Sequence, residues 1–143
     1  MAASKSEERK MMFNHVMVGA NDIDASKRFY DATLGALGSP VGIKDSATRC
    51  SYRMDGGLFM IKVPINGEPA SIGNGGTIGF KAAKQDDVDA WHAAGVNNGG
   101  ATCEDPPGVR VNGKFKVYLA YLRDPVGNKL CAAYLLPKEK GVT

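Results

Sequence analysis

The chain has 143 residues, of which 43% are hydrophobic and 23% charged, a composition typical of one ordinary globular domain. The formal net charge is only +3, and this small excess gives no reason to expect a nucleic-acid partner. The sequence has no apolar run that approaches the roughly 20 residues needed to span a membrane. We therefore expect a protein that binds neither nucleic acid nor a membrane.

The three cysteines, Cys50, Cys103 and Cys131, are widely spaced and odd in number. This pattern argues against a disulfide framework and predicts a reducing, cytoplasmic location. Residues 1–10 carry charges without an apolar core, so they predict a polar tail and not a signal peptide. We expect residues 11–143 to form a single domain.

The first half of the chain predicts a strand, a helix and further strands. A short β-rich run at 14–18 is followed by N-cap residues at 21–24, which favour a helix start. Gly35 is the expected end of that helix. Strands are expected around 47–54 and 58–63, joined by an Asp-Gly-Gly turn.

The same order recurs after a linker rich in glycine and proline at 64–76. The expected elements of the second half are a strand at 77–81, a helix that ends at Gly95, a loop at 99–112 and strands at 115–123 and 128–136. Each half would form a small sheet with a helix on one face. The other faces need a partner, and two such sheets would enclose a cleft suited to a small molecule.

The last two predicted strands form a hairpin around the turn Asp124-Pro125-Val126-Gly127-Asn128. Proline presets its own backbone angle, and glycine and asparagine tolerate positive φ. This segment is therefore expected to be a structural turn and not a catalytic motif.

The chain contains, in this order, the segments Phe13-Asn14-His15-Val16, Ser26 to Tyr30 with Leu34-Gly35, Thr77 to Phe80, Val88 to Gly95, and Tyr121 to Asn128. Taken together, in this order and at this spacing, they resemble the vicinal oxygen chelate superfamily of glyoxalase I, bleomycin-resistance and fosfomycin-resistance proteins and extradiol dioxygenases. The resemblance covers about residues 12–136. It implies an α+β fold with two βαβββ modules, about residues 12–66 and 76–137. Their mixed sheets would form a U-shaped, partly open barrel around a cleft, with the helices outside.

The resemblance also implies a metal held by a histidine on the first strand, a histidine opening the second module and a glutamate on the last strand. Such a metal stabilises two neighbouring substrate oxygens as a Lewis acid. The corresponding residues here are His15, Thr77 and Cys131, so only the first matches. A fourth position in some members falls at 58–61, where Met60 is the expected inward residue. We therefore expect no metal; if zinc, nickel, iron or manganese binds, His15 and Cys131 would hold it.

Each candidate residue also has a structural interpretation. His15 is either a cleft-lining proton donor or acceptor, or a hydrogen-bonded structural histidine. Cys131 is either a small buried filler or, with a lowered pKa, a nucleophile. Tyr118 and Tyr121 are three residues apart on one strand, so only one of them can face the cleft. The predicted cleft residues are His15, Tyr52, Met60, Thr77, Tyr118, Tyr121 and Cys131.

Four functions remain open at this stage. The favoured one is a metal-free protein that binds or acts on a small molecule in the cleft, with an eroded metal site. The second is a metal-dependent enzyme of the lactoylglutathione-lyase or extradiol-dioxygenase type, with non-standard ligands. The third is a metal-free enzyme, a lyase, isomerase or dioxygenase that uses His15 for proton transfer. The fourth is a protein-interaction subunit. The resemblance also implies a homodimer.

Overall fold

The computed structural model describes residues 12–137, apart from the side chain of Asn112. The predicted polar tail at 1–10 lies outside the described residues. The elements, in chain order, are β1 (Val16–Gly19), α2 (Ile23–Ala36), β2 (Ile43–Ser46), β3 (Arg49–Met54), β4 (Gly57–Lys62), β5 (Ile78–Lys81), α3 (Gln85–Asn97), β6 (Ala101–Asn112), β7 (Phe115–Arg123) and β8 (Lys129–Leu135).

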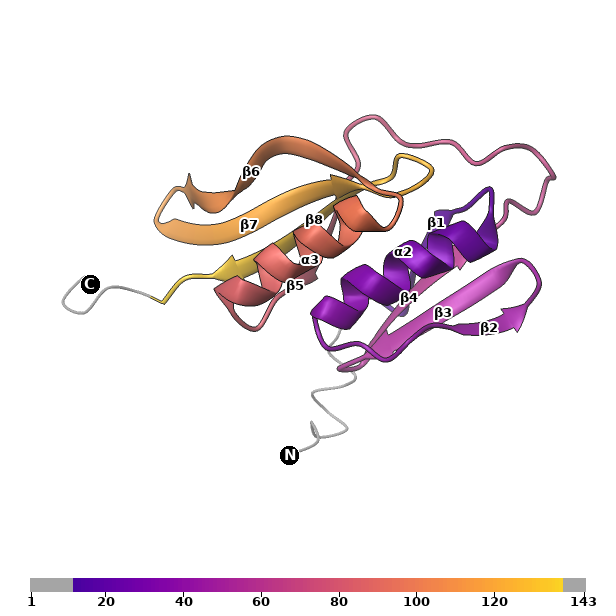
Figure 1. The fold of residues 1–143 in the computed structure, drawn as a ribbon, viewed down its shortest axis with the longest axis horizontal. Coiled ribbons are helices and arrows are strands. Elements are labelled where there is room, and N and C mark those ends of the chain that lie inside the picture. The colour runs from indigo at the N-terminus through magenta and orange to yellow at the C-terminus, as the bar shows by residue number, and fades with distance from the viewer. Residues whose placement is uncertain (1–11, 138–143) are drawn as a thin grey trace.

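These elements form two modules of the same design. The first sheet has the strand order β1-β4-β3-β2 and the second β5-β8-β7-β6. In each module the first strand is parallel to the last, and the other neighbours are antiparallel. Figure 1 shows α2 and α3 side by side on one side of the sheets. The predicted α+β fold of two βαβββ modules is confirmed, with open mixed sheets that do not close into a barrel.

Helix α2 begins where the sequence predicts, because Asp22 caps it. Its carboxylate accepts hydrogen bonds from the backbone N–H groups of Asp24 and Ala25, each at 3.0 Å. The predicted end at Gly35 is wrong, since the helix continues to Ala36. Gly38 has a φ of +100° and takes the left-handed position that follows a helix.

Gly95 likewise lies within α3 and does not end it. A Cβ at this position would overlap the Leu122 side chain of β7 and lie 3.2 Å from Phe29 of α2. This glycine is therefore needed for the close approach of α3 to its sheet and to the other helix. Gly99, with a φ of +93°, follows the true end of the helix.

The predicted loop at 99–112 is wrong, because most of it forms β6, which pairs with β7. The register shifts between Cys103 and Gly108, so the prolines of this segment fall within an irregularity of an edge strand. Proline is tolerated at such positions, where its missing N–H costs no ladder hydrogen bond.

The two modules share one hydrophobic core. Phe59 of β4 and Phe80 of β5 meet edge to face with ring centroids 5.2 Å apart. Tyr30 of α2 lies 4.9 Å from both Phe29 and Phe59, again between centroids. The cluster continues through Trp91 of α3, which is fully buried.

The predicted turn after β7 links the modules by hydrogen bonds. Asp124 is 4% exposed, and one of its carboxylate oxygens accepts from three successive backbone N–H groups of the turn at 2.9–3.0 Å. The other accepts from the Tyr30 hydroxyl at 2.6 Å and from the Asn128 side chain at 2.8 Å. The Asn128 amide also donates to the Gly19 carbonyl at 3.1 Å. The turn of the second module is thus bound to the helix and first strand of the first.

Candidate functional site

Alternation along each strand divides its side chains between the helix-covered face of the sheet and the opposite, open face. In β4, Phe59 and Ile61 belong to the core beneath the helices. Met60 lies between them and points to the open face, where Met17 and Ser51 are its cross-strand partners. The sequence prediction assigned the cleft to this open face.

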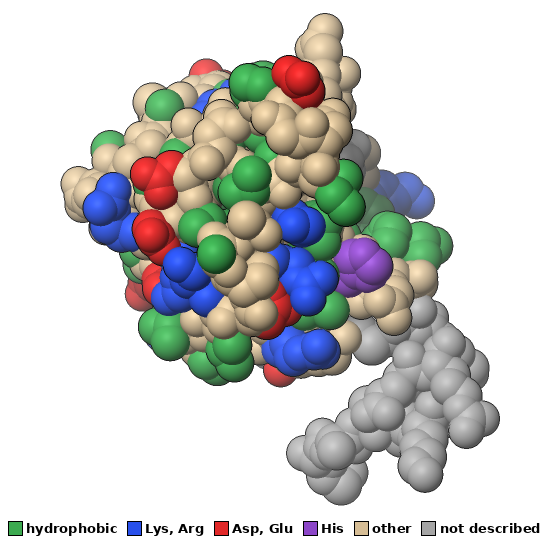
Figure 2. All heavy atoms as spheres, turned by 90° about the vertical axis from the view of Figure 1, so that its right-hand side faces the viewer, with side chains coloured by type: hydrophobic (Ala, Val, Ile, Leu, Met, Phe, Trp, Pro, Cys, Tyr) green, Lys and Arg blue, Asp and Glu red, His purple; other side chains and the backbone are tan. Residues whose placement is uncertain are grey.

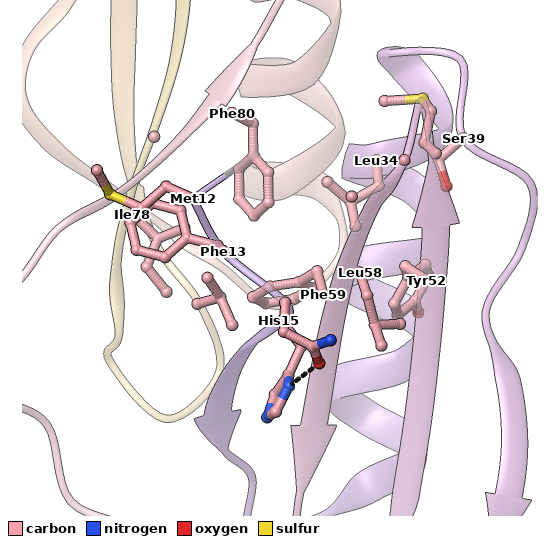
Figure 3. Close-up of a pocket in the computed structure, with 16 residues that line it drawn as sticks. Met12, Phe13, His15, Leu34, Ser39, Tyr52, Leu58, Phe59, Ile78 and Phe80 are labelled. Carbon is pink, nitrogen blue, oxygen red and sulfur yellow. Dashed lines mark hydrogen bonds between the residues drawn. The ribbon is translucent and has the colours of Figure 1, made fainter. Parts of the chain in front are cut away.

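An apolar pocket instead lies at the seam between the modules, next to the end of α2. Its volume is about 370 Å³, and it receives side chains from the segment before β1, from α2, from β3 and β4, and from β5. Figure 3 shows Phe13 beside Ile78, with Leu58 and Tyr52 on the other side of the pocket. The lining residues are Met12, Phe13, Asn14, His15, Val16, Leu34, Ser39, Tyr52, Met54, Gly56, Gly57, Leu58, Phe59, Ile78, Gly79 and Phe80.

His15 lies at the edge of this pocket, immediately before β1. It is exposed, and its Nδ1 is 2.8 Å from the side-chain oxygen of Asn14. In Figure 3 its imidazole points away from Phe80. His15 can therefore contact a ligand at the pocket mouth, with its other ring nitrogen left for that contact or for water.

Tyr52 forms part of the pocket wall, but its hydroxyl is used for structure. It donates to Asp31 of α2 at 2.7 Å and lies 3.2 Å from the Lys27 carbonyl. Burial and then the hydrogen bond to Asp31 raise the pKa of Tyr52 far above its usual value. Burial would raise the pKa of Asp31, yet hydrogen bonds from Lys27, the Gly42 N–H and Tyr52 hold it below its usual value. Tyr52 therefore shapes the pocket without offering its hydroxyl to a ligand.

The structure separates the two tyrosines of β7. Tyr118 points to the helix-covered face, where its hydroxyl donates to Asp89 of α3 at 2.6 Å. Tyr121 lies on the open face, in register between Cys103 of β6 and Cys131 of β8. Tyr118 therefore does not share the predicted cleft face, because an odd spacing reverses the side of a strand.

Cys131 is 7% exposed on the open face. Burial, and then the negative charge of Glu104, raise its pKa to about 11. A thiol with this pKa is almost fully protonated near neutral pH, so it is a poor nucleophile. Cys50, Cys103 and Cys131 are all free.

The residues at the superfamily's metal positions do not fit a divalent metal. His15 is a good ligand, but Met60 offers a thioether, Thr77 a hydroxyl and Cys131 a thiol in place of a carboxylate. Within residues 12–137, no three His, Cys, Asp or Glu side chains are grouped so that they could hold a metal ion. No catalytic step through a metal follows from this set of donors.

Thr77 lies apart from the apolar pocket and lines a second, more polar one of about 360 Å³. The other residues of this pocket come from the glycine-rich segment 72–76 and from Arg123 and Lys129. The sequence pattern at 72–76 predicted only part of a linker, and no local signal marked the two cations. It also missed Phe13 and Ile78 as pocket residues, because nothing in their local pattern indicates that the two modules meet there.

The paired modules and open sheets are those of the vicinal oxygen chelate class. The chain belongs to the Glyoxalase/Bleomycin resistance protein/Dioxygenase superfamily, which it matches over residues 12–132. No described helix is both long and apolar enough to cross a membrane.

The structure is similar to the crystal structure of a glyoxalase/bleomycin resistance protein from Albidiferax ferrireducens T118. The two share 56% sequence identity with a TM-score of 0.83, over 87% of this chain and 99% of the other. A glyoxalase-related enzyme from Fulvimarina pelagi has the same fold at 18% identity, with a TM-score of 0.65 over 87% and 88% of the two chains. A comparison with curated proteins gives no significant match.

Proposed function

We propose that this protein binds a small, largely apolar molecule in the pocket at the module seam, without a metal. The observation that carries the proposal is the pocket itself: about 370 Å³, with aromatic and aliphatic walls from both modules and one imidazole at its edge. Its volume lies within the range of small-molecule sites, and mostly apolar walls with a few polar groups are typical of them. The bleomycin-resistance part of the family name is compatible with such a binding role.

A neutral fluorescent probe, N-phenyl-1-naphthylamine, tests the pocket directly. We expect a saturable, one-site rise in probe fluorescence with the purified protein. Phe13 is 70% exposed, so Phe13→Ala should preserve the fold while it removes one pocket wall. The expected loss of affinity is roughly fivefold, as for the loss of one aromatic contact.

Phe115→Ala is the matched control, because Phe115 is 55% exposed on β7 and does not line the pocket. Ile78→Trp is a second variant that fills the pocket from β5 and should abolish probe binding. Absence of saturable binding, or equal losses in Phe13→Ala and Phe115→Ala, would overturn the proposal.

We also propose that the protein forms a homodimer, because the helices leave one face of each sheet uncovered. Analytical ultracentrifugation tests this proposal. We further propose a cytoplasmic location, which the three free cysteines support and which cell fractionation tests.

A further inference from the structure

The polar pocket at the start of β5 has an unusual lining. It is bounded by Arg123 at the end of β7, Lys129 at the start of β8, Thr77, and the segment Ile72-Gly73-Asn74-Gly75-Gly76. The pocket shares no lining residue with the apolar pocket at the module seam. Its features are therefore independent of the function proposed for that site.

The two cations are held side by side on one face. Arg123 and Lys129 are direct cross-strand partners in the β7–β8 ladder, so their side chains leave the sheet on the same side. Like charges in this position repel each other, which is costly unless an anion lies between or beside them. The register of β5 on β8 places Thr77, one residue before Ile78, next to Lys129.

Among the residues that the structure describes, only Lys129 of the two cations has an acidic partner. Lys129 forms an ion pair with Glu104 of β6, and its ammonium group lies 4.8 Å from the centroid of the Tyr121 ring. Arg123 donates one hydrogen bond, at 3.0 Å, to the Gly127 carbonyl, and forms no ion pair with any residue in the range 12–137. Its guanidinium has five N–H donors, so most of them are available to a ligand.

The arginine is positioned by the turn that carries Asp124. Gly127 belongs to this turn and has a φ of +111°, and its carbonyl accepts from Arg123. Ile72 packs over the same glycine, because a Cβ there would lie 3.6 Å from the Ile72 side chain. The glycine-rich segment is therefore placed against the turn that orients the arginine. Asn74 and Gly75 are the central residues of a turn, and their backbone N–H groups have no acceptor among the described residues.

From this geometry we propose that the polar pocket is a binding site for the oxyanion of a small molecule, a phosphate or carboxylate group. Arg123 supplies a fork of donors to its oxygens, Lys129 a second positive charge and Thr77 a hydroxyl. Glu104 is the counter-ion of Lys129 and would compete with the ligand for it. On the face drawn in Figure 2, Lys and Arg are interspersed with acidic and hydrophobic side chains.

The test is an NMR titration of the 15N-labelled full-length protein with inorganic phosphate, and separately with acetate, against chloride at constant ionic strength. We expect saturable shifts of the backbone amides at 72–77. Tighter phosphate binding identifies a phosphate-bearing ligand, and equal or tighter acetate binding a carboxylate-bearing one. Absence of saturable shifts with both anions would overturn the proposal.

The variants test each contact. Arg123→Gln and Lys129→Gln should each weaken anion binding by roughly fivefold or more, as for loss of a charge-assisted hydrogen bond. Thr77→Val should weaken anion binding by a smaller factor. Because Thr77 is exposed, this variant should fold and can test the site even if Arg123→Gln misfolds. Glu104→Gln should strengthen binding, because it releases Lys129 from its counter-ion.

Arg53→Gln is the matched control, since Arg53 is exposed on β3 and does not line the pocket. An Arg53→Gln effect equal to that of Arg123→Gln would show non-specific attraction to net charge and overturn the site. So would weaker binding in Glu104→Gln. None of these outcomes depends on binding of the apolar probe.

Discussion

Two consecutive residues of helix α2 each form a tyrosine–aspartate hydrogen bond, Tyr30 as the donor and Asp31 as the acceptor. Tyr30 donates its hydroxyl to Asp124 of the second module at 2.6 Å. Asp31 accepts the hydroxyl of Tyr52, in its own module, at 2.7 Å. The two tyrosine–aspartate pairs are therefore alike in chemistry and differ in what they connect.

Their surroundings differ as well. Asp124 is 4% exposed and accepts five hydrogen bonds, none of them from a cation. The Asp31 side chain is 24% exposed and is paired with Lys27 at 2.6 Å. Loss of one partner of a buried hydrogen bond leaves the other partner unsatisfied and destabilises the fold. The same loss near water costs far less, because water replaces the missing partner. The Asp124 pair should thus control the stability of the whole domain, and the Asp31 pair only the local fit of α2 on its sheet.

Each pair also supports a different pocket. Tyr52 forms a wall of the apolar pocket, whereas the turn that contains Asp124 positions Arg123 of the polar pocket. Damage to one pair should therefore affect one pocket more than the other, which separates the two proposed sites experimentally.

The largest effect is expected for Asp124→Ala. The change removes the carboxylate that accepts from the Tyr30 hydroxyl, the Asn128 side chain and the backbone N–H groups of Val126 and Asn128, whereas the Gly127 N–H keeps its bond to the Asp124 carbonyl. The free energy of unfolding should therefore fall by about 3–5 kcal/mol. Urea denaturation at pH 7 measures it. Asp105→Ala, at an exposed carboxylate, is the control and should change stability by less than about 0.5 kcal/mol. A loss below about 1 kcal/mol in Asp124→Ala would contradict the anchoring role of this turn.

Removal of the two hydroxyls compares the pairs directly. Tyr30→Phe should cost about 1–3 kcal/mol, because it removes a donor from a buried carboxylate. Tyr52→Phe should cost about 0.5–1.5 kcal/mol, since Asp31 keeps its hydrogen bonds from Lys27 and Gly42. The measurement is the urea midpoint of each variant. Equal losses would show that the difference in burial does not matter.

Alkaline pH should weaken the fold through the same tyrosines. Burial raises the pKa of Tyr30 well above the usual value of 10.0, with a further contribution from Asp124. A group whose folded pKa is raised stabilises the protein fully below its unfolded pKa, and this stability is lost as pH rises. As pH rises above about 10, the stability lost through Tyr30 should approach about 1.4 kcal/mol per pH unit.

The slope of stability against pH between 10 and 11 tests this. Tyr30→Phe should have a shallower slope than the wild-type protein, because phenylalanine cannot ionise. The same slope in both proteins would mean that the Tyr30 hydroxyl ionises as easily in the folded as in the unfolded state.

The smallest effect is expected for Asp31→Asn. Hydrogen bonds hold the pKa of Asp31 below its usual 3.8, so its carboxylate stabilises the fold above that pH and loses this effect as pH falls through the folded pKa. Because the side chain is partly exposed, the loss at pH 7 should be about 1 kcal/mol or less. The difference between Asp31→Asn and wild type should shrink below pH 4, and a constant difference would contradict the role of the charge.

The sequence predicted an element correctly where the residues of one short segment are enough to specify it. Asp22 marks the start of α2, and the Asp-Pro-Val-Gly-Asn segment forms the predicted turn. Gly35 and Gly95 were misjudged as helix ends, because a glycine inside a helix looks the same in sequence as a glycine with positive φ after it. Gly95 is needed for packing, whereas a Cβ at Gly35 would meet nothing within 4 Å. The prolines of β6 made its sequence look like a loop. A strand that contains prolines can pair only at a sheet edge and with a register shift, and neither can be predicted from the segment alone.

The sequence by itself determined the α+β class, the two repeated modules and the departures from the metal pattern at Thr77 and Cys131, because each of these rests on residue type and local order. Only the tertiary structure decided which side chains share a pocket. Strand parity turned Tyr118 towards α3 and Tyr121 away from it. The seam between modules brought Phe13 to Ile78, and the turn at Asp124 placed Arg123 beside Lys129. Phe13 and Ile78 belong to different modules, so their proximity depends on how the two sheets pack, whereas Arg123 and Lys129 are paired by the register of one hairpin.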